Sequence, residues 1–147
     1  MAINFKKYAE EGDGFVKKLS KNLGHPDEIG RSGSILRAVL HTIRERITMA
    51  ESLNLIAQFP MFLKALYVDG WKFREQPVKF DKREFLDEVK KHQDQYGETE
   101  FNWEKSTEEI VTIVLSELRL YISEGEYEDI MDQLPDDLKE MFLKTTH

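Results

Sequence analysis

Apolar residues recur every three or four positions along most of the chain, which is the spacing of one face of an α-helix. The first stripe comprises Phe5, Tyr8, Ala9, Gly12, Phe15, Val16, Leu19 and Leu23. Two later stripes comprise Leu36, Val39, Leu40, Ile43 and Ile47, and then Ile110, Ile113, Val114, Leu118 and Ile122. Strand-like alternation is nearly absent, and only residues 78–80 suggest extended chain. The pattern predicts an all-α protein.

Helix-capping signals divide these stripes into shorter elements. Residues 48–51, Thr-Met-Ala-Glu, fit a capping box, in which the hydroxyl and the carboxylate satisfy unpaired backbone donors. A helix is therefore expected to start there and to run to about Gln58. Pro60 suits the first turn of the next helix, which should end near Asp69-Gly70. The same signals recur at 106–109, at 123–126 and at Pro135.

The two halves of the chain resemble each other. Residues 35–67 align with residues 110–142 at a constant offset of 75 without a gap. Identical pairs include Ile35/Ile110, Val39/Val114, Leu40/Leu115, Arg44/Arg119, Ile47/Ile122, Glu51/Glu126, Gln58/Gln133, Pro60/Pro135, Leu63/Leu138 and Lys64/Lys139. This similarity predicts an internal repeat.

The predicted repeats cover about residues 4–71 and about residues 81–145, with a linker at 72–80. Each repeat would contain four helices, which is too small a unit to form an adequate core alone. We therefore expect one bundle-like domain over 1–147, with about eight helices in two pseudo-symmetric four-helix repeats that share one core.

Several motifs also resemble a known family. They are the segment at 37–46, Ala-Gln-Phe-Pro at 57–60, Tyr-Val-Asp-Gly-Trp at 67–71, Ile-Ser-Glu-Gly-Glu at 122–126 and Gln-Leu-Pro at 133–135. In this order they are similar to the bacterial domain-of-unknown-function family 2267, over roughly residues 5–143. The resemblance implies an all-helical, internally duplicated bacterial domain. It implies no activity, and it supplies no catalytic residues.

Composition and charge narrow the functional classes. Hydrophobic residues make up 40% of the chain, enough for a folded core, and no apolar run reaches the roughly 18 residues that would cross a bilayer. The net charge is −7, with +3 on residues 1–73 and −10 on residues 74–147. Phosphate backbones and anionic membranes repel such a chain, so we expect neither nucleic acid nor membrane as a partner. A cytoplasmic protein is the expectation, because no apolar leader segment opens the sequence.

The sequence gives no signature of catalysis, of a cofactor or of a metal site. There is no cysteine, and the histidines, His25, His41, His92 and His147, do not form the spacings of a zinc site. Phosphate-loop, dinucleotide and nucleophile-elbow motifs are also absent. Arg44 and Arg119 are equivalent in the predicted repeats, and each is expected to bind the last backbone carbonyls of its helix or a carboxylate such as Glu51 or Glu126. The functional alternative is that the two arginines together bind an anionic ligand.

The differences between the repeats indicate a surface. Five apolar residues of repeat one, Met49, Leu53, Met61, Phe62 and Ala65, align with Glu124, Glu128, Asp136, Asp137 and Glu140. Five buried, unpaired carboxylates would be prohibitively costly, so these positions should face outward in both repeats. The apolar set therefore requires a cover. That cover is either Trp71, Phe73, Val78 and Phe80 folded back, or a second subunit, or a helix of a partner protein.

Two functional hypotheses follow. In the first, the protein is a non-enzymatic interaction or regulatory module that forms a homodimer or binds another protein through the apolar set. In the second, a small molecule binds in a crevice beside Tyr67, Asp69 and Trp71, where aromatic walls and a carboxylate could orient it, with or without catalysis. The sequence favours the first.

Overall fold

The structure is a computed structural model that describes residues 3–72, 77, 81–95 and 104–145. These residues form eight α-helices and one 3₁₀ turn, with no strand among them. The helices are α1 (Phe5–Asn22), α2 (Ile29–Arg46), α3 (Met49–Gln58), α4 (Met61–Val68), α5 (Lys82–Gln95), α6 (Thr107–Leu118), α7 (Glu124–Asp132) and α8 (Asp136–Leu143), and the turn η1 (Arg119–Tyr121) follows α6. The all-α prediction is confirmed. Residues 78–80, and most of the predicted linker, lie outside the described residues.

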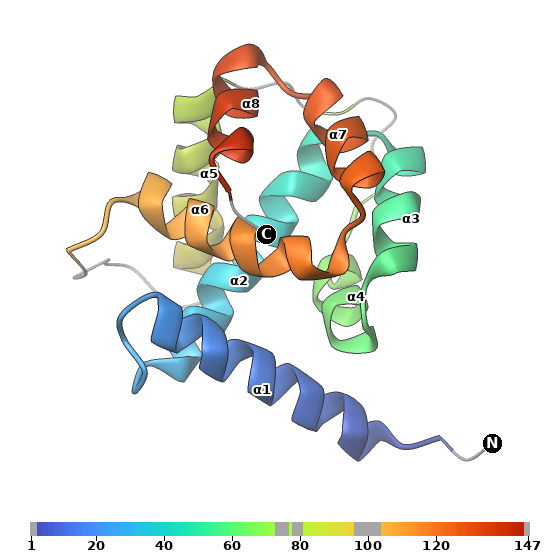
Figure 1. The fold of residues 1–147 in the computed structure, drawn as a ribbon, viewed down its shortest axis with the longest axis vertical. Helices are drawn as coiled ribbons and strands as arrows, with labels where there is room; N and C mark the ends of the chain where they lie inside the picture. The colour runs from blue at the N-terminus through green and yellow to red at the C-terminus, as the bar shows by residue number, and fades with distance from the viewer. Residues whose placement is uncertain (1–2, 73–76, 78–80, 96–103, 146–147) are drawn as a thin grey trace.

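Helix α2 crosses the centre of the molecule (Figure 1). It contacts α1, α4, α5 and α6, and its most extensive contact is with α5. Most of its side chains are buried, including Leu36, Val39 and Leu40, which are fully inaccessible. Between residues 35 and 46 of this helix only Arg37 and Glu45 are not buried, so other elements surround it on nearly all sides. The core is therefore built around α2, and both halves of the chain contribute to it.

The short helices begin where their capping residues predict. The hydroxyl of Thr48 accepts from the Glu51 amide, and the hydroxyl of Ser123 accepts from the Glu126 amide, both at 3.2 Å. Among the three predicted capping boxes, however, only that of α6 closes in both directions, because the Glu109 carboxylate accepts from the Ser106 amide. Helices α4 and α8 each follow a proline, which sits at the N-cap and not in the first turn.

Glutamines from the opposite half complete the other two caps. The Thr48 amide donates to Oε1 of Gln133 at 2.9 Å, and the Ser123 amide donates to Oε1 of Gln58 at 2.7 Å. Each glutamine lies at the end of one short helix and caps the start of the other. Helices α3 and α7 are thereby joined through their ends, beside each other at one side of the molecule (Figure 1).

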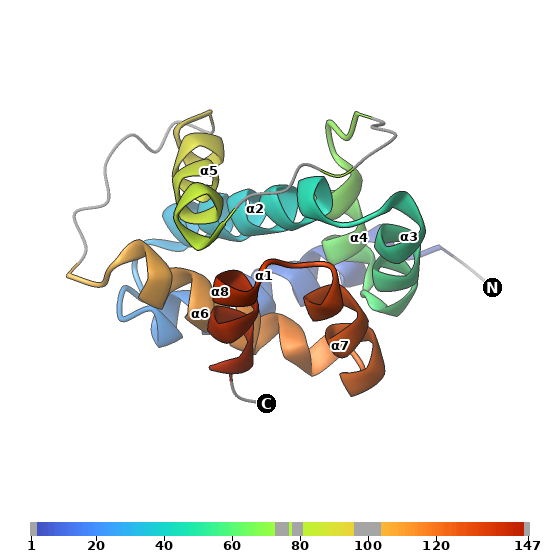
Figure 2. The same ribbon diagram turned by 90° about the horizontal axis from the view of Figure 1, so that it is seen from above.

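Only the second part of α1 packs into the core. Phe15, Leu19 and Leu23 are buried, whereas Phe5 is 75% exposed and Ala9 is also exposed. Figure 1 shows the N-terminal end of α1 extending beyond the other helices, and in Figure 2 the chain that leads into α1 emerges beside α3. The apolar stripe predicted a helix correctly, but its first turns have no described neighbour to bury them.

The cover of Phe62 comes from α1 and η1. Its ring lies 5.4 Å from that of Phe15 and 6.4 Å from that of Tyr121, measured between ring centroids. Three residues of the predicted cover, Phe73, Val78 and Phe80, lie outside the described residues. The close approach of α1 to α4 depends on Gly12, because a Cβ there would lie 3.2 Å from the Phe62 Cβ.

Two glycines of α1 should respond differently to alanine. Gly14 is exposed, and a Cβ there meets nothing within 4 Å, so Gly14→Ala should raise the free energy of unfolding by about 1 kcal/mol through helix propensity. Gly12→Ala gains the same propensity but pushes against Phe62, so the gain should be cancelled or reversed. Urea denaturation measures both. Equal gains in the two variants would show that α1 does not press on α4.

Candidate functional site

The predicted apolar set lies on α3 and α4, and it is partly exposed. Leu53 is 57% exposed and Met61 is 46% exposed, and Ala65 is also exposed. Met49 and Phe62 are half-buried. The prediction that these positions face outward agrees with the placement of Leu53, Met61 and Ala65, whereas Phe62 turns toward α1. We call Met49, Leu53, Met61, Phe62 and Ala65 the apolar face.

The aligned acidic residues lie on α7 and α8, and all are exposed: Glu124, Glu128, Asp136, Asp137 and Glu140. Their carboxylates therefore remain hydrated, as the cost of burying a charge requires. Positions that carry apolar side chains on α3 and α4 therefore align with positions that carry exposed carboxylates on α7 and α8.

Further exposed apolar residues were not part of the predicted set. Val68, at the end of α4, and Ile3 and Phe5, at the start of α1, are exposed large hydrophobic residues. The signal for Phe5 was present in the sequence as the first member of the apolar stripe, but the stripe alone cannot tell a buried turn from an exposed one. These residues enlarge the apolar surface available on the first half of the chain.

The predicted crevice residues are placed differently from one another. Tyr67 is fully buried, its hydroxyl lies 2.7 Å from the Ser52 hydroxyl, and its ring packs edge-on against Trp71. Burial raises the pKa of the Tyr67 phenol well above its ordinary value. Asp69 is exposed and Trp71 is half-buried. The Tyr67 hydroxyl is therefore occupied inside the core, and a ligand at this corner would meet only Asp69 and Trp71.

The two equivalent arginines bind backbone carbonyls, as predicted, but those of other helices. Nη1 of Arg44 donates to the carbonyls of Tyr67 and Asp69 at the end of α4, at 2.6 and 2.7 Å. Nη1 of Arg119 donates to the carbonyl of Thr145, just after α8, at 3.0 Å. Each guanidinium thus fixes the last helix of its half to the long helix of that half.

A pair of carboxyl groups meets where α3 faces α7. Glu126 is buried and hydrogen-bonded to Glu51, and Asp129 lies nearby. Burial, followed by the hydrogen bond and charge of Glu51, raises the pKa of Glu126 to about 8. Glu126 therefore keeps its proton near neutral pH. The two residues occupy equivalent positions in the capping boxes, and because glutamines supply the missing half of each cap, these carboxyl groups are left to face each other.

Two groups of described side chains have the donor atoms for a metal ion. The group of Glu51, Glu126 and Asp129 contains only carboxyl oxygens, and within it the pKa of Glu126 is raised. The group of Glu45, Glu88 and His92 adds an imidazole nitrogen. Burial would raise the pKa of Glu45, but hydrogen bonds from His92 and Arg46 and their charges outweigh it and lower that pKa. Sequence reasoning missed this second group, because its members come from two helices.

An open cleft of about 520 Å³ lies between the starts of α5 and α6. Its cations include Lys82, but the Lys82 ammonium is 2.7 Å from the Glu108 carboxylate, and the N-terminus of α6 is closed by its own capping box. These contacts occupy Lys82 and the N-terminus of α6, whereas Arg83 and Lys90 also line the cleft.

Comparison with known proteins places the chain in a family without assigning a reaction. A family model described as "Uncharacterized conserved protein (DUF2267)" matches residues 12–141. No curated protein matches the chain. None of the described helices combines the length and apolar character that crossing a bilayer requires.

The raised pKa of Glu126 predicts a fall in stability with rising pH. Between about pH 4.5 and about pH 8 the unfolded chain loses this proton while the folded chain keeps it, so folding is disfavoured as pH increases. Glu126→Gln should remove this fall and raise the free energy of unfolding at pH 8 by on the order of 1–3 kcal/mol, with little change near pH 4.5. Chemical denaturation across pH 4.5–9 measures the difference.

Glu128→Gln is the matched control, because Glu128 is an exposed carboxylate on the same helix. It removes one negative charge and leaves the Glu51–Glu126 pair intact. The decrease in the free energy of unfolding with rising pH that Glu126 causes should therefore persist. If Glu126→Gln also keeps the wild-type pH dependence, the two carboxyl groups do not share a proton.

Proposed function

The chain belongs to the DUF2267 family, and we propose that it is a non-enzymatic interaction module that pairs with a second copy of itself through the apolar face. The observation that carries this proposal is the contrast between Leu53 and Met61, which are exposed, and their acidic counterparts, Glu128 and Asp136. Exposed methionine and leucine side chains are costly to leave in water. Methionine is also a residue that interfaces favour.

The charge distribution favours a second copy that docks face to face. Exposed carboxylates cover α7 and α8, namely Glu124, Glu128, Asp129, Asp132, Asp136, Asp137 and Glu140. Two such surfaces would repel each other. An apolar face docked against one of them would strip water from the carboxylates and offer them no polar group in return. A two-fold contact between the two apolar faces avoids both costs, because the same patch serves both subunits.

The start of α1 adds to the proposed contact. A standard interface buries roughly 800 Å² on each partner, more than five side chains supply. Ile3 and Phe5 are exposed, and α1 packs on α4 through Gly12 and Phe62, so the apolar stripe of α1 begins within a few turns of the apolar face. The proposed interface therefore includes the first turns of α1.

A duplicated architecture explains how one half acquired this surface. We infer that the two halves are copies of one four-helix unit. Helices α3 and α7 begin 75 residues apart, and α4 and α8 both begin and end 75 residues apart. The reciprocal glutamine caps and the paired arginines support the same relation. With the interior common to both copies, only the outward positions are free to diverge.

Acidic substitution should abolish the proposed self-association. Met61→Asp and Leu53→Glu place on α3 and α4 the charges that the second half already carries at these positions, so the fold should tolerate them. Sedimentation velocity from about 1 to 100 μM, the range of moderate protein affinities, should show a dimer for the wild type and a monomer for each variant.

Leu143→Asp is the matched control, because Leu143 is an exposed apolar residue on α8, away from the apolar face. It should leave the dimer intact. A monomeric wild type throughout this range would overturn the proposal, and so would a dimer that persists in Met61→Asp.

The inferred equivalence of the halves can be tested at the glutamines. Gln58→Ala and Gln133→Ala each remove the acceptor of one N-cap amide, so each should lower the free energy of unfolding by about 1 kcal/mol. Gln133→Ala should cost no less than Gln58→Ala, because Gln133 also donates to Glu51. Urea denaturation measures both. A neutral effect at one glutamine alone would contradict the equivalence.

A further inference from the structure

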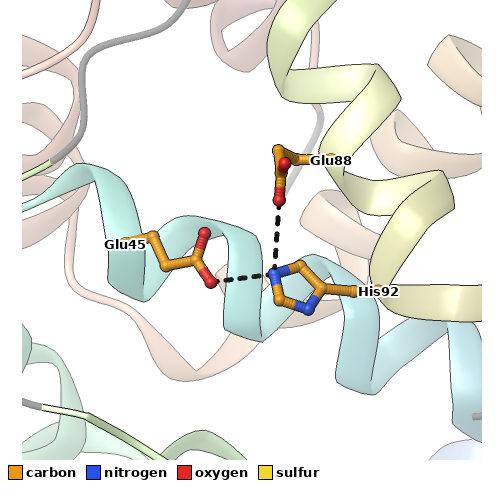
Figure 3. A group of neighbouring side chains, drawn as sticks. All are labelled: Glu45, Glu88 and His92. Carbon is orange, nitrogen blue, oxygen red and sulfur yellow. Dashed lines mark hydrogen bonds and ion pairs between the residues drawn. The ribbon is translucent and has the colours of Figure 1, made fainter. Parts of the chain in front are cut away.

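Three metal-binding side chains converge where α5 packs on α2. Glu88 and His92 lie one turn apart on α5, and Glu45 lies near the end of α2. Figure 3 shows both carboxylates directed at the same ring nitrogen, Nε2 of His92. That nitrogen is 2.8 Å from Oε1 of Glu45 and 3.7 Å from Oε2 of Glu88. The three donor atoms all lie within 4.8 Å of one another.

The distances between these donor atoms are close to the distances between ligand atoms around one metal ion. Zinc binds imidazole nitrogen and carboxylate oxygen at about 2.0–2.2 Å, so two of its ligands are roughly 3.0 Å apart at right angles and about 3.4 Å apart at the tetrahedral angle. The observed 2.8 and 3.7 Å bracket these values. The third pair, the Glu45 and Glu88 oxygens, lies within 4.8 Å, so side-chain rotation that brings these two oxygens to about 3.4 Å from each other would place all three atoms around one ion.

The surroundings hold the ligands while leaving an approach from solvent. The side chains of His92, Glu45 and Glu88 are 12%, 20% and 22% exposed. Nη1 of Arg46 contacts Oε2 of Glu45 at 3.3 Å, which orients this carboxylate and leaves Oε1 directed at His92. The backbone positions are fixed by the α2–α5 contact, the most extensive between helices of the described chain.

We propose that Oε1 of Glu45, Oε2 of Glu88 and Nε2 of His92 bind one Zn²⁺ ion, with solvent at the remaining position. One nitrogen and two oxygens suit zinc, whereas magnesium and calcium favour oxygen ligands alone. The ion replaces the proton that Nε2 donates to Glu45. The neutral ring then carries its proton on Nδ1, so the exchange leaves two carboxylates and one neutral imidazole around the metal.

The neighbouring groups set the expected strength of this site. Lys91 is 3.7 Å from Glu88, and the guanidinium of Arg46 faces Glu45, so both cations compete with the metal for the carboxylates. The ring of His41 lies 6.1 Å from that of His92, and burial lowers the pKa of His41 to about 4, so this neighbour is uncharged. Nδ1 of His92 has no hydrogen-bond partner among the described residues. We therefore expect an affinity about 10–100-fold below that of a site with a supported histidine.

Calorimetric titration of the tag-free full chain with zinc sulfate tests the proposal. The wild type should bind one Zn²⁺ per chain. His92→Gln and Glu88→Gln each remove one ligand at similar volume and should weaken this binding at least about 10-fold. Binding of Co²⁺ gives a second readout, because its visible absorption bands report coordination by the protein and should be lost in His92→Gln.

His25→Gln is the matched control. His25 also contacts a carboxylate, with Nδ1 2.9 Å from Oε2 of Glu28, but this pair is not one of the groups with a third donor. Its removal should leave zinc affinity and the cobalt spectrum unchanged. Circular dichroism establishes that each variant keeps its helices. The proposal is overturned if the wild type shows no saturable binding, or if folded His92→Gln and Glu88→Gln bind as the wild type does.

Discussion

The arrangement of the molecule depends on two backbone amides, those of Thr48 and Ser123, each capped by a glutamine from the other half of the chain. A capping box normally satisfies such an amide within its own helix. Here the exchange ties the start of α3 to the end of α7 and the start of α7 to the end of α3. It also releases Glu51 and Glu126 from capping, so the two carboxyl groups face each other, and one of them must stay protonated.

Because the two glutamine caps hold α3 against α7, they also determine which side chains of these helices face outward. Arg44 and Arg119 hold the ends of α4 and α8 to the long helices, so the interior of each half is largely prescribed. The outward positions carry no such constraint. They are apolar on α3 and α4 and acidic on α7 and α8. In the dimer that we propose, this difference decides the contact. An apolar face that also bound the acidic surface of a second copy would make head-to-tail contacts, which can extend into chains instead of closing as a pair.

Local sequence signals predicted the helices well, since capping residues and apolar spacing act within one or two turns. The bounds of α3 and α4 follow from Thr48, Pro60 and Gly70. The features that the sequence did not predict depend on contacts between residues that are far apart in the chain. The stripe of α1 does not reveal that Phe5 lies beyond its neighbours, and the capping motifs do not reveal that glutamines complete them. The Glu45–His92 contact joins residues 47 positions apart, which no spacing motif describes.

The two proposed sites act on different parts of the fold. Glu45, Glu88 and His92 join α2 to α5, and therefore the first half of the chain to the second, so an ion bound there stabilises the folded chain by mass action. The apolar face belongs to α3 and α4, and its members Leu53 and Met61 contribute little to the fold, since both remain exposed. Loss of metal binding should thus leave association unaffected while the chain stays folded. The converse also holds, because Leu53 and Met61 are exposed and neither belongs to the group of Glu45, Glu88 and His92.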